Sequence, residues 1–132
     1  MPDKPLTIGR LARAAGVNVE TVRYYQRLGL VARPPRPAAG YRLYDKATIH
    51  RIQFIKRAQC LGFSLREIAR LLELGEGQCD DVRAQAERRR RKIEAQIQEL
   101  MLMKARLERL IGQCRDSTPG HGCPIVSALN ES

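Results

Sequence analysis

The sequence predicts a mainly α-helical protein with a small β-wing: a winged helix-turn-helix DNA-binding domain followed by one long dimerisation helix. Three observations predict this class. Short amphipathic segments that end at glycines fill residues 1–75, a long helical segment without Pro or Gly covers about 80–111, and the net charge is +10 over 132 residues. So large an excess of Lys and Arg favours nucleic acid as the partner. A basic protein without such a partner is the alternative.

The first two helices form a helix-turn-helix pattern. Thr7 can cap the first helix, which Gly16 ends, and Asn18 can cap the second, which stops at Gly29. A tight glycine turn between two short helices is typical of DNA-binding helix-turn-helix units, although many helical hairpins share it.

The segment after the second helix predicts the wing. Residues 33–44, RPPRPAAGYRLY, contain three prolines and a glycine, which exclude a helix. The alternation over residues 41–44 is typical of a short strand that returns from a turn. A small β-wing beside the helix-turn-helix is therefore expected.

Two further helices complete the predicted core. Asp45 can cap a helix that runs to about Cys60, and Gly62 breaks it. Ser64 and Glu67 form a capping box in which each side chain bonds to the other residue's backbone N–H. The helix that they start ends near Leu74.

The long helix predicts a homodimer. Its apolar positions recur at steps of three and four residues, which is typical of a coiled-coil seam. A single helix would leave this stripe in water, so a second chain is expected to cover it. The run at 87–92, ERRRRK, is interpreted as a solvated face rather than a DNA contact. The seam consists of Ile93, Ile97, Leu100, Lys104, Leu107 and Ile111.

The domain organisation follows from these segments. We expect a DNA-binding domain over residues 1–75, a dimerisation helix over 76–112, and a metal-binding loop with a C-terminal tail over 113–132. No signal peptide or membrane-spanning run is visible, so a cytoplasmic protein without a membrane partner is expected. The four cysteines therefore indicate metal or redox chemistry before disulfides.

Three of the cysteines predict a metal site shared between subunits. Cys114 and Cys123 flank a loop rich in Gly and Pro, and two thiols make an incomplete metal site. Cys79 is separated from them by a helix roughly 50 Å long, at about 1.5 Å per residue. Two helices in antiparallel orientation would place Cys79 of one subunit beside the other two of its partner. Three unconnected thiols are the alternative from spacing alone.

The chemistry of such a site favours a soft metal. Thiolates select soft, polarisable ions, and the positive end of the helix dipole near Cys79 favours a deprotonated sulfur. Cys60 is interpreted as a packed thiol of the core. His121 could supply a fourth ligand to zinc, but it is interpreted as an uncoordinated loop histidine.

The sequence resembles the MerR family of transcriptional regulators over nearly its whole length. The resembling stretches are TIGRLARAAGVNVETVRYYQRLGL, GYRLYD, LGFSLREIARLLEL, GQCDD and the C-x8-C-P pattern at the end. The three cysteines resemble the mercury(II)-responsive branch. The resemblance implies an antiparallel coiled-coil homodimer that binds Hg(II) through three thiolates, with Cys79 from one subunit and Cys114 and Cys123 from the other.

The resemblance also implies a mechanism of regulation. Such a protein binds palindromic double-stranded operator DNA in a promoter whose −35 and −10 elements are too far apart. Without metal it represses while RNA polymerase is held there. With Hg(II) it distorts the DNA so that polymerase can start on mercury-resistance genes.

The expected DNA contacts come from the second helix and the wing. Asn18 and Thr21 lie at the N-terminal part of the second helix, where contact with bases or phosphates is expected. Tyr24 and Tyr25 are adjacent, and adjacent residues of a helix cannot both face the groove of the DNA, so one of these two tyrosines should be largely buried. The resemblance implies further contacts from Arg23, Tyr24, Tyr25, Arg42 and Tyr44.

Two alternative functions stay open. One is a regulator for another thiophilic ion, such as cadmium, lead or zinc. The other is a thiol redox sensor in which Cys114 and Cys123 form a disulfide. An enzyme is not expected, because the sequence has no nucleophile–base constellation, only two histidines and no Gly-rich phosphate loop.

Overall fold

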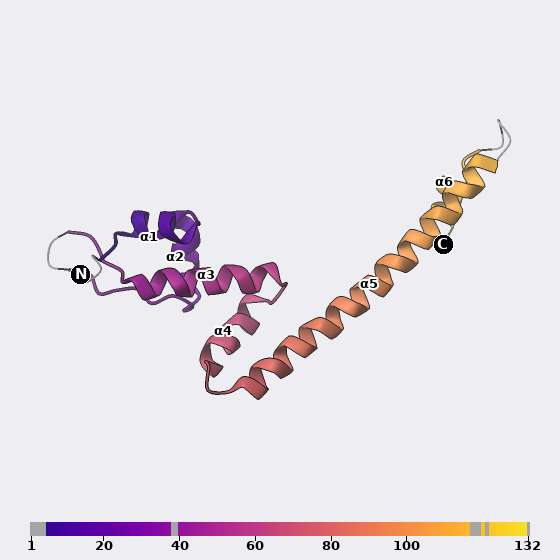
Figure 1. Cartoon of the computed structure of the whole chain (residues 1–132). Coiled ribbons are helices and arrows are strands. Elements are labelled where there is room, and N and C mark those ends of the chain that lie inside the picture. Colours follow the sequence, from indigo (N-terminus) through magenta and orange to yellow (C-terminus); the bar gives the residue numbers. More distant parts are fainter. Residues whose placement is uncertain (1–4, 38–39, 117–119, 121, 132) are drawn as a thin grey trace. The chain divides into compact units, whose positions relative to one another are not determined.

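The computed structural model describes residues 5–37, 40–116, 120 and 122–131. It divides into two compact units, Met1–Val82 and Arg83–Ser132, and each is considered by itself. The described residues form six helices in chain order (Figure 1). These are α1 (Ile8–Ala15), α2 (Val19–Arg27), α3 (Lys46–Cys60), α4 (Leu65–Leu74), α5 (Cys79–Asp116) and α6 (Pro124–Asn130). A mainly helical fold was predicted and is confirmed.

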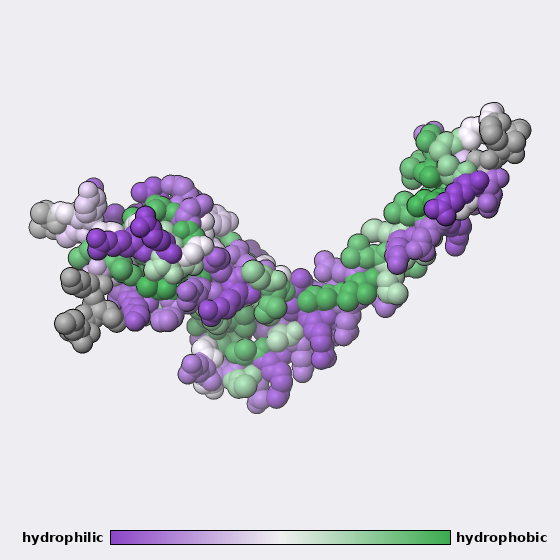
Figure 2. Space-filling view, turned by 45° about the horizontal axis from the view of Figure 1, so that its top comes forward, coloured by the Kyte–Doolittle hydropathy of each residue, from purple (hydrophilic) through white to green (hydrophobic). Residues whose placement is uncertain are grey.

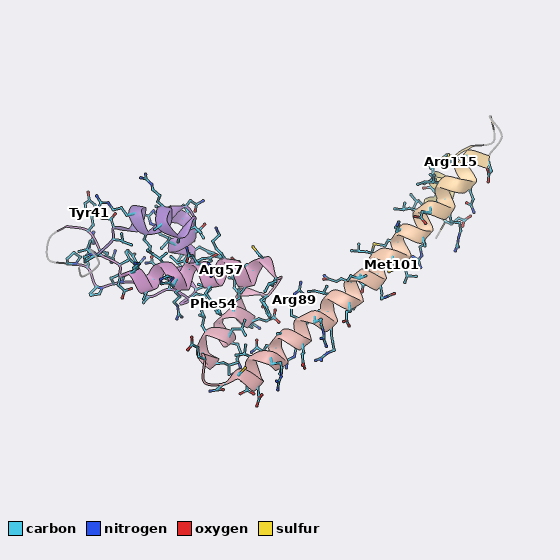
Figure 3. The ribbon with its side chains drawn as sticks, viewed as in Figure 1. Tyr41, Phe54, Arg57, Arg89, Met101 and Arg115 are labelled. Carbon is cyan, nitrogen blue, oxygen red and sulfur yellow. The ribbon has the colours of Figure 1, made fainter. Side chains whose placement is uncertain are left out.

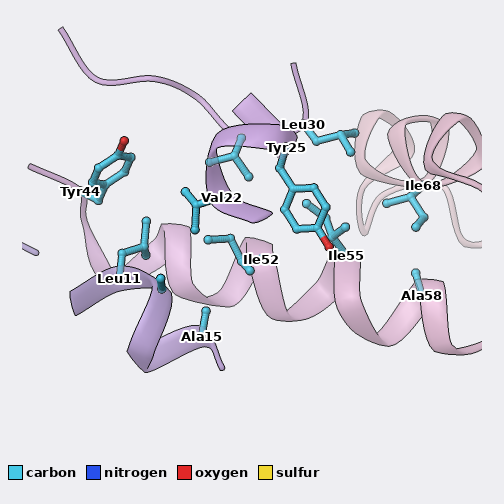
Figure 4. Close-up of a cluster of buried hydrophobic side chains, with 12 residues drawn as sticks. Leu11, Ala15, Val22, Tyr25, Leu30, Tyr44, Ile52, Ile55, Ala58 and Ile68 are labelled. Carbon is cyan, nitrogen blue, oxygen red and sulfur yellow. The ribbon is translucent and has the colours of Figure 1, made fainter. Parts of the chain in front are cut away.

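The first unit is built around α3. Helices α1 and α4 both pack against α3, and α1 also packs against α2. Figure 4 shows apolar side chains from these helices meeting in one cluster, with Leu11, Val22, Ile52 and Ile55 fully buried. Burial of a side chain of this size contributes about 1.5–3 kcal/mol, so this cluster holds the four helices of the unit in place.

Side-chain caps start the helices of this unit at the predicted residues. Asn18 accepts a hydrogen bond from the Thr21 N–H, and Asp45 accepts one from the Thr48 N–H. The Ser64 capping box is complete, with both reciprocal bonds to Glu67 present. Each cap satisfies a backbone donor that the helix itself cannot satisfy.

The turn between α1 and α2 depends on Gly16. Its φ of 75° lies in the left-handed region, which a residue with a Cβ adopts only at a cost. This conformation ends α1 and lets Asn18 begin α2 two residues later. The helix-turn-helix prediction is therefore confirmed at its central turn.

The wing differs from the predicted short strand. Among the described residues, the only β-pairing is an antiparallel bridge between Leu6 and Tyr44, with N–H···O distances of 2.8 and 2.7 Å in the two directions. The strand expected over residues 41–44 is thus reduced to one paired residue. Helix α1 begins two residues after Leu6 and α3 begins two residues after Tyr44, so the backbone leaves the extended conformation on both sides of this pair and a longer ladder does not form.

The second unit contains most of α5, together with α6. Helix α5 runs further in both directions than the predicted range of about 80–111. None of its residues is buried, and Figure 3 shows Arg89, Met101 and Arg115 projecting from it. Apolar residues follow α5 as a stripe in Figure 2. The stripe includes the predicted seam residues Ile93, Ile97, Leu100, Leu107 and Ile111, all of them exposed.

Helix α6 was not predicted. The sequence predicts a metal-binding loop and a tail over residues 113–132, whereas the structure forms a helix over Pro124–Asn130. Pro124 occupies the first turn, where its missing N–H costs nothing and its fixed φ favours the helix. Seven residues are too few to show helical periodicity in the sequence. No helix of the described residues combines the length and the apolar character needed to span a membrane.

Candidate metal centre and nucleic-acid interface

The structure brings two of the three predicted metal ligands together. Cys114 lies near the C-terminal end of α5, and Cys123 directly precedes α6. The Cys114 side chain donates a hydrogen bond to the Cys123 sulfur, and both residues are exposed. An exposed pair of adjacent thiols is a ready site for a soft metal ion.

The start of α6 favours the thiolate form of Cys123. The backbone N–H of Val126 and then that of Ile125 lower the pKa of this thiol, slight desolvation opposes them, and Cys114 adds a smaller lowering. The Cys123 side chain makes no capping hydrogen bond, so we attribute this effect to the electrostatic attraction between the two N–H groups and the thiolate. A lowered pKa increases the share of thiolate, which is the form that binds metals.

Cys79 lies at the opposite end of the same helix. It is the first residue of α5 and is exposed, with Asp80 and Asp81 in the same first turn. The helix separates it from Cys114 by about 50 Å, at 1.5 Å per residue. Within one chain, the described residues include no group of three His, Cys, Asp or Glu side chains that could hold a metal ion.

Cys60 and His121 are the two other residues of the sequence considered as possible metal ligands. Cys60 is exposed, so its assignment as a packed core thiol was wrong. It lies two residues after the buried Ala58, and a step of two turns a side chain to the opposite side of a helix. His121 lies outside the described residues.

The two adjacent tyrosines of α2 take opposite positions. Tyr24 is 43% exposed and Tyr25 only 3%, which confirms that one of the pair is buried. Burial raises the pKa of Tyr25, whose hydroxyl donates to Gln59 Oε1 at 2.7 Å. Tyr44 is also buried, and its hydroxyl accepts a hydrogen bond from Gln26. Tyr25 and Tyr44 therefore expose very little surface for the DNA contacts predicted for them.

The exposed face of α2 carries the other predicted contacts. Arg23 pairs with Glu20 at 2.9 Å, and the Arg27 guanidinium lies over the Tyr24 ring at 5.7 Å from its centroid. At the start of the helix, Asn18 Oδ1 accepts from both the N–H and the hydroxyl of Thr21. The side of α2 that faces away from the core thus presents polar, basic and aromatic groups.

Arg23 and Arg42 meet in a cleft that the sequence did not reveal. We name it the arginine cleft; it has a volume of about 190 Å³ and is lined by residues of α1, α2 and the wing segment. Arg33 and Tyr41 belong to it as well and were not predicted as site residues. The loop RPPRP contains two arginines, and nothing in the sequence distinguishes which of them lines a cleft.

A helix-turn-helix with an exposed basic and aromatic face defines a DNA-binding protein of the winged helix-turn-helix class. Two family descriptions match the chain, "MerR HTH family regulatory protein" over residues 6–75 and "MerR, DNA binding" over residues 49–110. The chain belongs to the MerR family of transcription regulators. Membership of this family, which is not enzymatic, agrees with the expectation of no catalytic site.

Individual relatives are similar over nearly the whole chain. The mercuric resistance operon regulatory protein of Pseudomonas fluorescens is 42% identical over 125 residues, covering 94% of this chain and 87% of the relative. A lead(II)-bound transcription regulator of Ralstonia metallidurans CH34 superposes with a TM-score of 0.81 at 30% identity, covering 94% and 98% of the two chains. The mercury(II)-bound MerR of Bacillus megaterium MB1 gives 0.75 at 36% identity, covering 96% and 100%.

Proposed function

We propose that this protein is a mercury(II)-responsive transcription regulator of mercury-resistance genes. It acts in the cytoplasm as a homodimer on operator DNA, represses without metal and activates RNA polymerase with it. The observation that carries the proposal is the contact between Cys114 and Cys123, with a lowered pKa at Cys123. The 42% identity to a mercuric resistance regulator supports mercury as the metal.

The proposed site takes its third thiolate from the second subunit. The exposed apolar stripe of α5 needs a partner, and an antiparallel pairing of two such helices would bring opposite ends together. Cys79 of one subunit would then complete the site formed by Cys114 and Cys123 of the other. A two-fold dimer repeats the arrangement at both ends. The residues fit the ion, because three exposed sulfurs suit a soft metal and no hard oxygen ligand is required.

A site across the dimer joint explains how metal could control transcription. An ion shifts an equilibrium only by the difference in its affinity for two states. Coordination that fixes the end of one α5 to the start of the other favours one dimer arrangement. The DNA-binding units of that arrangement would distort the promoter differently, and the energy of DNA deformation depends on the sequence deformed.

Mixed dimers test the shared site. Cys79→Ala homodimers lack one ligand at each site, and Cys114→Ala/Cys123→Ala homodimers lack two. A dimer with one chain of each kind regains one complete site, because its intact ligands come from different subunits. We expect the mixed dimer to bind one Hg(II) with three sulfur ligands under a competing thiol, whereas neither homodimer binds Hg(II) in this way.

The Cys60→Ala variant is the control for the mixed-dimer experiment. Cys60→Ala should retain two ions per dimer, since Cys60 takes no part in the proposed site. All variants should retain binding to operator DNA. A mixed dimer that binds no better than its two parents would show that the three cysteines do not meet across subunits.

Lead(II) is the second candidate ion. The structural similarity to a lead-bound regulator, with a TM-score of 0.81, favours it specifically. Competition between Hg(II) and Pb(II) for the protein in thiol-buffered solution shows which ion binds more tightly. The same experiment compares Hg(II) with cadmium and with zinc. Tighter binding of lead, cadmium or zinc would replace mercury in the proposal without changing the ligands.

A thiol redox sensor is the remaining alternative. The contact between Cys114 and Cys123 would also suit a disulfide. Induction by mercury in a strictly reduced extract supports the metal regulator. A response that occurs only under oxidising conditions, and without metal, supports the sensor.

A further inference from the structure

The arginine cleft gathers positive charge from two separate segments of the chain. Helix α2 contributes Arg23, and the wing segment contributes Arg33 and Arg42. The start of α1 closes the cleft on the remaining side, and the described residues that line it include no carboxylate. Three guanidinium groups in one small cleft repel one another, and an anion between them would relieve this repulsion.

The three arginines differ in how far their hydrogen-bonding groups are already used. Arg23 shares its charge with Glu20 at 2.9 Å. Arg42 donates its Nε–H to the Pro34 carbonyl at 3.0 Å, which orients the guanidinium and leaves its other N–H groups for a ligand. Arg33 is exposed and has no hydrogen bond or ion pair within the part of the chain that the structure describes.

The walls of the cleft are held together by hydrogen bonds. The bridge between Leu6 and Tyr44 ties the wing to the residues before α1. Gln26 of α2 donates to the Tyr44 hydroxyl, which ties the wing to α2. A cleft fixed in this way presents its donors with little loss of conformational entropy on binding.

We propose that the arginine cleft binds a phosphate group of the DNA backbone and that Arg33 is one of its binding residues. The planar guanidinium fork matches phosphate geometry, and phosphate contacts fix the position of a protein on a duplex without reading its sequence. Tyr41, which is 80% exposed at the cleft, can add a hydroxyl donor. The inference rests on the proposed function, because it requires that the protein bind duplex DNA.

The salt dependence of DNA binding tests this assignment. The probe is a fluorescent duplex of mixed sequence, titrated with the full-length dimer at several salt concentrations. Each phosphate contact contributes about −0.9 to the slope of log K against log salt. Arg33→Gln removes one contact per subunit, so the slope of the dimer should become shallower by about 1.8. The weakening should be similar for duplexes of different sequence.

Two further variants make the test specific. Arg33→Lys retains the charge and should keep the slope of the parent. Arg109→Gln, which changes an exposed arginine of α5 outside the cleft, loses the same charge and should also keep it. Circular dichroism verifies that each variant folds, and Arg33→Glu replaces Arg33→Gln if the latter does not.

The possible outcomes separate the two proposals. A parent slope retained in Arg33→Gln, or an equal change in Arg109→Gln, would overturn the role of Arg33. A parent protein that does not bind duplex DNA at all would overturn the proposed function itself. A loss of Hg(II) binding alone would affect the metal proposal and leave the phosphate contact standing.

Discussion

Cys123 shows how a single position changes the chemistry of a thiol. Its sulfur lies at the start of α6, where the N–H groups of Val126 and Ile125 stabilise negative charge. The sequence predicted Cys123 as a ligand but could not predict this effect, because it did not predict α6. The same pattern holds for Tyr24 and Tyr25: the sequence predicted that one is buried, and only packing decided which.

The lowered pKa of Cys123 predicts its reactivity. In a Cys60→Ser/Cys79→Ser/Cys114→Ser protein, alkylation of Cys123 by iodoacetamide should rise with pH through a midpoint below that of the same protein unfolded in urea. The sign follows because the fold favours the thiolate, so the thiolate appears at lower pH when α6 is formed. The measurement is the alkylation rate against pH by mass spectrometry. Equal midpoints in the two states would contradict the effect of α6.

At the scale of single elements, local signals were sufficient where a helix has its own start and stop. Helices α2, α3 and α4 begin at the predicted caps Asn18, Asp45 and Ser64. The wing was less predictable, because alternation in the sequence does not reveal whether a partner strand exists. Its only described partner residue is Leu6, more than thirty residues upstream of Tyr44.

The capping box of α4 predicts a measurable loss of stability. Ser64→Ala removes the oxygen that accepts from the Glu67 N–H and should lower the free energy of unfolding by about 1 kcal/mol. Ser64→Asp is the control, because an aspartate at this position can accept the same bond. Urea denaturation followed by circular dichroism measures both variants. A Ser64→Asp loss as large as that of Ser64→Ala would show that the cap is not the cause.

At the scale of the whole molecule, the exposed stripe of α5 points to a second chain. Leu100 and Leu102 are almost equally exposed, at 62% and 63%. Their positions differ by two residues, so they lie on opposite sides of the helix, and only Leu100 belongs to the predicted seam. A comparison of substitutions at Leu100 and Leu102 therefore distinguishes a loss of seam contacts from a general change in surface hydrophobicity.

Dimerisation through the seam can be tested with these two leucines. Leu100→Glu places a charge in the proposed interface of both subunits and should weaken the dimer about 100-fold or more, given about 1.5–3 kcal/mol for each buried leucine. Leu102→Glu should leave the dimer intact. Sedimentation equilibrium over a range of protein concentrations measures both. Equal weakening by the two variants would place the interface elsewhere.

The sequence by itself determined the helical fold, the caps, the turn at Gly16, the apolar stripe of α5 and the candidate metal ligands. Each depends on local spacing or on residue chemistry, which a chain carries wherever it folds. Only the tertiary structure decided that Tyr25 is buried, that Cys60 is exposed, that Cys123 contacts Cys114 and that Arg33 lines a cleft with Arg23 and Arg42. These facts depend on which surfaces of separate segments meet, and packing sets that rather than sequence spacing.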